Sequence, residues 1–106
     1  AVSLGGSVTI VTGPASSAVS SNITMAANNK YFVSTAAART LTLPASASVG
    51  DSIEVYDATG TAATYNITVA PNSHKINGSV QNYIIDVNGA ATTLTYTGTS
   101  YGWKVR

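Results

Sequence analysis

Residues 40–69 hold three short segments in which apolar and polar side chains alternate, and this alternation constrains the fold more than any other feature. Successive side chains of a β-strand point to opposite faces, so residues two positions apart lie on the same face. The three segments therefore predict strands that share one hydrophobic core, with polar side chains on the other face. The predicted core pairs are Leu41 with Leu43, Ile53 with Val55, and Ile67 with Val69.

Turn-forming residues separate further strand-like segments along the chain. Asn77-Gly78 is the strongest hairpin signal, because both residues readily adopt the positive φ that a two-residue turn needs. Residues 22–25 and 30–35 flank a pair of Asn residues, and we predict a second hairpin there. The whole pattern predicts an all-β fold, an antiparallel β-sandwich or jelly-roll-like barrel of about eight to nine short strands.

Two segments depart from the alternating pattern. Residues 36–38 are three alanines between strand signals, and we predict a loop there. Residues 83–87 are apolar on both sides, which predicts a strand covered on both of its faces.

The first part of the chain has the weakest domain pattern. Residues 7–12 form a short strand candidate, and Gly13-Pro14 with the following Ser/Ala run indicates a turn and an extended linker. We therefore predict an N-terminal arm or linker over residues 1–21 and a single β domain over residues 22–106. The arm is expected to lie on a neighbouring subunit or to connect to another segment.

The composition excludes several classes of function. Charged residues make up 8% of the 106 residues and the net charge is +1, so no basic field is available to hold nucleic acid. No apolar run approaches the ~20 residues that a membrane-spanning helix needs, so we expect no membrane insertion. The absence of Cys excludes thiol catalysis, Cys-based zinc sites and disulfides. Since low charge also leaves strand edges unprotected, we expect either that the edges are covered or that subunits associate.

Few residues could carry catalysis. His74 is the only His and lies in a polar turn, which is typical of an exposed loop rather than of a catalytic base. The carboxylates of Asp51, Glu54, Asp57 and Asp86 are scattered, and Asp51 and Asp57 occupy turn positions where Asp accepts backbone amides. The glycines form no phosphate-binding pattern, and no EF-hand spacing occurs. We therefore predict no catalytic residue, no metal site and no cofactor.

The aromatic residues are the more informative set, because Tyr and Trp on a sheet offer a large contact area with a polar tip. Trp103 shares a face with Val105, and Tyr65 is in phase with Ile67. The residues that we predict for surface recognition are Tyr56, Tyr101, His74 and Asn72. The residues that we predict for the core or a subunit interface are Tyr65, Tyr83 and Trp103.

Residues 31–105 resemble a β module found in tail-fibre and other surface-appendage proteins of tailed bacteriophages. The resemblance rests on the successive segments T-L-T-L-P, G-D-S-I-E-V-Y-D-A-T-G-T-A, N-I-T-V-A-P-N-S-H-K-I-N-G and L-T-Y-T-G-T-S-Y-G-W-K-V. The matching positions are structural rather than catalytic: Leu43-Pro44, Gly50-Asp51, Asp57, Asn66, Pro71, Ile76-Asn77-Gly78 and Gly102-Trp103.

The resemblance implies a virion protein, usually a homotrimer, that is exposed on the particle surface after assembly in the host cytoplasm. The family module normally follows a long shaft, whereas about thirty residues precede it here. A capsid decoration or head-fibre protein, anchored to other virion proteins through the N-terminal arm, is therefore an alternative to a fibre tip.

We expect a non-enzymatic, trimeric structural module on a fibre or capsid, with host-surface glycan as a further partner. A carbohydrate-binding module of a secreted enzyme is the alternative, which predicts a monomer with a planar strip of exposed Tyr and Trp. A small glycoside hydrolase or esterase that uses Asp51, Asp57 or Asp86 is the third hypothesis.

Overall fold

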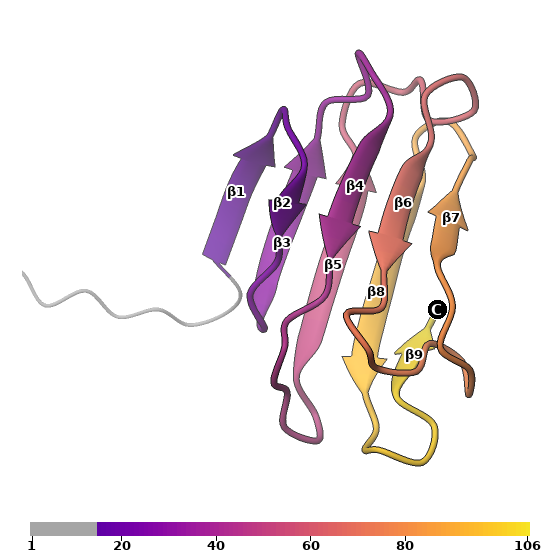
Figure 1. Cartoon of the computed structure of the whole chain (residues 1–106). Helices are drawn as coiled ribbons and strands as arrows, with labels where there is room; N and C mark the ends of the chain where they lie inside the picture. Colours follow the sequence, from indigo (N-terminus) through magenta and orange to yellow (C-terminus); the bar gives the residue numbers. More distant parts are fainter. Residues whose placement is uncertain (1–14) are drawn as a thin grey trace, which may run out of the picture.

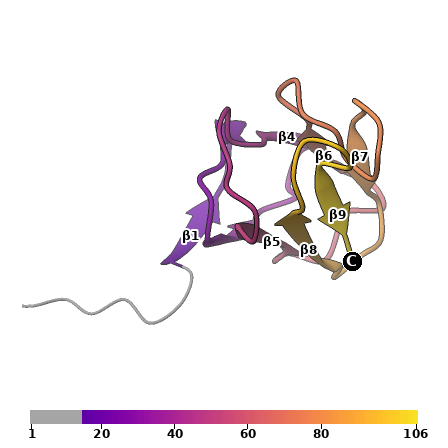
Figure 2. The same ribbon diagram turned by 90° about the horizontal axis from the view of Figure 1, so that it is seen from below.

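The computed structural model describes residues 15–106, which form nine strands in two mixed sheets and contain no helix (Figure 1). The five-stranded sheet has the order β1 (Ala15–Val19), β3 (Asn29–Val33), β5 (Ser52–Asp57), β8 (Ala91–Tyr96) and β9 (Trp103–Val105). The four-stranded sheet has the order β2 (Ile23–Thr24), β4 (Arg39–Thr42), β6 (Ile67–Ala70) and β7 (Tyr83–Ile85). Figure 2 shows the two sheets facing each other. The prediction of an all-β fold with about nine short strands is confirmed.

The first six strands alternate between the two sheets, so neighbours within each sheet run parallel. β1, β3 and β5 pair in parallel in one sheet, and β2, β4 and β6 pair in parallel in the other. The prediction of antiparallel sheets is therefore wrong for this part of the chain. The hairpin predicted over residues 22–35 is also wrong, because β2 and β3 belong to different sheets and the turn between them leads from one sheet to the other.

The last three strands run antiparallel to their neighbours. β7 pairs with β6, β8 with β5, and β9 with β8. Asn77 and Gly78 have φ values of 51° and 90°, and an antiparallel bridge joins Ile76 to Ser79. The tight turn predicted at Asn77-Gly78 is therefore confirmed, and a parallel bridge from Ile76 to Trp103 attaches it to β9.

One hydrophobic core lies between the sheets, and it is built from the inward-facing residues of strands in both sheets. All six residues of the predicted core pairs in residues 40–69 have no exposed surface, which confirms that prediction. Full burial of one such side chain contributes about 1.5–3 kcal/mol to folding. The core comprises Val19, Met25, Tyr31, Val33, Leu41, Leu43, Ile53, Val55, Ala62, Ile67, Val69, Ile76, Ile85, Leu94, Tyr96 and Trp103.

Two further expectations concern the edges of the fold. Residues 83–87 are not covered on both faces, since Ile85 is buried while Ile84 is 43% and Val87 63% exposed. The reason is that, within the described residues, the four-stranded sheet has a core on one face only (Figure 2).

The five-stranded sheet begins at Ala15, inside the region predicted as an arm over residues 1–21. The strand candidate at residues 7–12 lies outside the described residues.

Gly102 lets two segments approach each other closely. Its φ is 81°, and a Cβ at this position would overlap the carbonyl group of Lys75. The approach allows the Trp103 N–H to donate to the Lys75 carbonyl over 2.8 Å. This contact holds the loop before Ile76 against the start of β9.

Gly102→Ala should therefore lower the free energy of unfolding by about 3 kcal/mol, because steric overlap adds to the cost of a positive φ. Gly60→Ala is the matched control, since Gly60 has a φ of 78° and nothing within 4 Å of the added Cβ. The control should lower the free energy of unfolding by only about 1–2 kcal/mol. Urea unfolding of both variants measures the difference, and equal losses would contradict the close approach.

Candidate functional site

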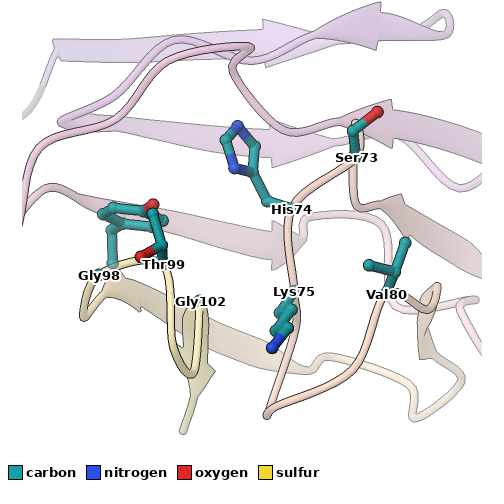
Figure 3. A pocket seen from close by; sticks show the side chains of 8 residues that line it. Ser73, His74, Lys75, Val80, Gly98, Thr99 and Gly102 are labelled. Carbon is teal, nitrogen blue, oxygen red and sulfur yellow. The ribbon is translucent and has the colours of Figure 1, made fainter.

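A cavity of about 170 Å³ lies at one end of the molecule, between the loop that follows β6 and the turn between β8 and β9. We call it the end cavity. Figure 3 shows Ser73, His74, Lys75 and Val80 on one side and Gly98, Thr99 and Gly102 on the other. The lining residues are Ser73, His74, Lys75, Val80, Tyr96, Gly98, Thr99 and Gly102.

The loop on the first side of the end cavity has an unusual backbone. Asn72 and Ser73 have φ values of 50° and 70°, in the left-handed region that non-glycine residues seldom adopt. The side-chain amide of Asn72 donates to the Leu43 carbonyl over 2.8 Å, and the backbone N–H of His74 donates to the Pro71 carbonyl over 3.0 Å. These hydrogen bonds offset a conformational cost of order 1–2 kcal/mol per residue and fix the loop.

The His74 ring is held from two sides. Its Nε2 lies 2.8 Å from the Ala45 carbonyl oxygen, and the ring meets Tyr96 edge to face at a centroid distance of 5.9 Å. Because a carbonyl oxygen can only accept, Nε2 of His74 is the donor in this contact.

The turn on the second side is closed by its own hydrogen bonds. The Gly102 N–H donates to the Gly98 carbonyl over 2.9 Å, and the Thr97 hydroxyl donates to the Gly102 carbonyl over 2.7 Å. Lys75 joins the two sides, since its Nζ donates to the Ser100 carbonyl over 3.2 Å. The end cavity is therefore bounded by two segments that are fixed before any ligand arrives.

The structure does not bring all four predicted recognition residues together. His74 lines the end cavity, and Asn72 shapes its loop through the Leu43 carbonyl. Tyr101 is 41% exposed in the adjacent turn, where its ring approaches Gly78 and lies 5.4 Å from Lys104 Nζ. Tyr56 lies elsewhere, on the outer face of the five-stranded sheet.

Tyr56 belongs to an apolar row that crosses this outer face. The strand registers align Ala18 with Phe32, Phe32 with Tyr56, and Tyr56 with Ala91, and we call these four residues the outer aromatic row. The two rings have centroids 5.1 Å apart, and Phe32 is 37% exposed. Phe32 was missed by the sequence analysis, although its position between the inward-facing Tyr31 and Val33 indicates an outward side chain.

The Tyr56 hydroxyl donates to the Glu54 carboxylate beside the outer aromatic row. This hydrogen bond raises the pKa of Tyr56, and partial burial and the Glu54 charge act in the same direction. Tyr56 is therefore a neutral donor with its hydroxyl already engaged, which leaves its ring as the contact surface.

The aromatic residues predicted for the core or an interface separate into three environments. Trp103 is fully buried, and Tyr83 is half-buried against the core. Tyr65 is 44% exposed, so it is not a core residue of this chain and only the interface part of its prediction stands. The Trp103 Nε1 atom is buried without a hydrogen-bond partner in the described structure.

Asp57 is a buried structural carboxylate rather than a free acid. It accepts hydrogen bonds from the Gly89, Ala62 and Gly60 N–H groups and from the Thr35 hydroxyl. Burial raises the pKa of Asp57, but the four hydrogen bonds to the charged form outweigh it and hold the pKa well below its usual value. The predicted turn role of Asp57 is therefore confirmed.

Asp51 and Asp86, the other candidate acids, lie in different surroundings. Asp51 accepts from the Ser48 N–H over 2.9 Å, as expected for a turn Asp, whereas Asp86 is exposed. Among residues 15–106, no three His, Cys, Asp or Glu side chains gather as metal ligands. The described part of the chain also holds no helix that is long and apolar enough to cross a membrane.

No protein-family profile matches this chain, and no curated protein matches its sequence significantly.

The Asp57 contacts predict an acid-dependent loss of stability. The folded pKa lies below the unfolded value of about 3.9, so the carboxylate stabilises the fold above that pH, and this contribution is lost as the pH falls towards the folded pKa. Asp57→Asn should lower the free energy of unfolding by roughly 2 kcal/mol at neutral pH. It should also remove the part of the acid-induced loss of stability that comes from Asp57.

Urea unfolding between neutral pH and about pH 2 measures both effects. Asp86→Asn is the matched control, since Asp86 is exposed, and it should leave the free energy of unfolding unchanged at neutral pH. An Asp57→Asn protein that loses stability with acid as steeply as the wild type would show that Asp57 is not the linked group.

Proposed function

We propose that this chain is a non-enzymatic structural module of a bacteriophage virion surface, a homotrimer on a fibre or capsid that contacts host-surface glycan. The observation that carries the proposal is the outer aromatic row, an apolar strip on an outward sheet face. The sequence resemblance supplies the virion setting. Attachment to other virion proteins through the N-terminal arm, residues 1–21, remains a prediction, and residues 1–14 of that arm lie outside the described structure.

The outer aromatic row is suited to contact with another copy of the chain. Phe32 and Tyr56 stack on each other, and the small residues Ala18 and Ala91 on either side leave the rings accessible. Burial of such rings between subunits contributes to association, and copies around one symmetry axis can place the same row in contact. The charged content of 8% adds little repulsion between copies.

The same pair of rings also favours the second candidate, a carbohydrate-binding module of a secreted enzyme. Exposed aromatic rings on a rigid sheet can stack on the C–H face of a sugar without losing much side-chain entropy. That function needs the rings free, and it therefore predicts a monomer. The oligomeric state distinguishes the two candidates.

Light scattering at micromolar concentration should give the mass of a trimer for the wild type. Phe32→Glu should give a monomer of unchanged fold, because a carboxylate would be buried without a partner in the interface. Ile84→Glu is the matched control, since Ile84 is exposed to a similar extent on the other sheet, and it should remain trimeric.

A wild-type monomer would contradict the proposal and favour the carbohydrate-binding module. If Ile84→Glu dissociates the trimer and Phe32→Glu leaves it intact, the interface lies on the four-stranded sheet.

A further inference from the structure

We propose that the end cavity binds a single sugar ring that carries a carboxylate, as in a uronic acid unit of a glycan. The inference rests on the glycan-contact part of the proposed function and gives that contact a site and a ligand class. It places the glycan site at the end of the sheets, away from the outer aromatic row.

The size of the end cavity sets the size of the ligand. Its volume of about 170 Å³ is below the ~300–1,000 Å³ typical of pockets for drug-sized molecules. One ring-sized group therefore fits, and further units of a glycan would extend outside.

The lining combines apolar and hydrogen-bonding groups in the way that a sugar ring requires. Val80, which is 62% exposed, offers apolar surface to the C–H groups of a ring, and the largely buried Tyr96 adds a small apolar area. Thr99 supplies a hydroxyl that both donates and accepts, and the His74 ring adds a second hydrogen-bonding group. Ring hydroxyls are themselves donors and acceptors, so a sugar can satisfy both kinds of group.

The charge of the lining selects among sugars. Lys75 is the one lysine in the lining, and none of the lining residues is a carboxylate. The Lys75 ammonium uses one donor on the Ser100 carbonyl, which leaves two for a ligand. A ligand carboxylate would form a charge-assisted hydrogen bond there, which is stronger than a bond to a neutral hydroxyl.

The site is also organised before binding. Both bounding segments are held by hydrogen bonds, and the contact between Lys75 and Trp103 that Gly102 permits fixes their separation. Little loop ordering would then be needed when a ligand binds, which favours affinity for a small ligand.

The test is a titration of the ¹⁵N-labelled full chain with methyl β-D-glucuronide and methyl β-D-glucoside, two probes that differ only in the carboxylate. The glucuronide should bind with a Kd of about 1 mM, and the amides of Ser73, Lys75 and Thr99 should shift. The glucoside should bind about 10-fold more weakly, because it lacks the charge-assisted bond.

Lys75→Gln removes the charge and the hydrogen bond to the Ser100 carbonyl, so it should weaken glucuronide binding about 10-fold more than it weakens glucoside binding. Thr99→Val should weaken both probes. Lys30→Gln is the matched control, because Lys30 lies on β3, away from the cavity lining, and it should bind both probes as the wild type does.

Three outcomes would overturn the inference: equal affinity for the two probes, shifts centred on Phe32 and Tyr56, or no binding at concentrations roughly 50-fold above the expected Kd. Light scattering on the same samples separates this inference from the proposed function. A trimer that binds neither probe contradicts the inference alone. A monomer that binds glucuronide in the end cavity supports the inference and contradicts the trimer.

Discussion

Burial of every second side chain between two facing sheets is the constraint on which the rest of this structure depends. The inward-facing apolar residues of β3 to β6 are fully or almost fully buried, while their outward neighbours are mainly polar or charged residues and the Phe32–Tyr56 pair. The alternation leaves one covered face and one open face on each sheet. The open faces are therefore available for contact with another copy of the chain.

Two local devices fix the loops to this core. The Asp57 carboxylate accepts hydrogen bonds from the N–H groups of Gly60, Ala62 and Gly89. It therefore joins the loop after β5 to the turn before β8. At the opposite end, Gly102 brings β9 against the backbone of Lys75. Both devices satisfy polar groups that would otherwise be buried without partners, which costs about 1–3 kcal/mol each. Lys75 and Gly102, which make the second contact, both line the end cavity.

The sequence predicts those features that depend on near neighbours. Alternation identifies the core residues of β4, β5 and β6, and Asn77-Gly78 identifies a turn through its backbone preference. Strand pairing depends on distant residues, so the parallel order of β1, β3 and β5 could not be read from the same pattern. Residues 22–35 illustrate this limit. The predicted turn is present, but it connects strands of two different sheets instead of two neighbouring strands of one sheet.

The candidate sites follow the same division. His74 could be singled out as a polar turn residue, but Lys75 and Ser100 meet across 25 positions of sequence, and only the fold brings them together. The outer aromatic row likewise depends on strand register, although the outward direction of Phe32 follows from its neighbours. Tyr65 precedes β6 instead of lying in it, so its phase with Ile67 did not place it in the core.

The central claim is that another copy of the chain covers the outer aromatic row. Phe32 is the only phenylalanine, so selective labelling gives ring signals that need no further assignment. The direct measurement is the NMR relaxation of the Phe32 ring by a soluble paramagnetic agent, recorded over a range of protein concentrations. The account predicts that the ring is protected in the assembled protein and becomes accessible on dilution. A ring that is equally accessible at every concentration, in a protein that is still trimeric, would contradict it.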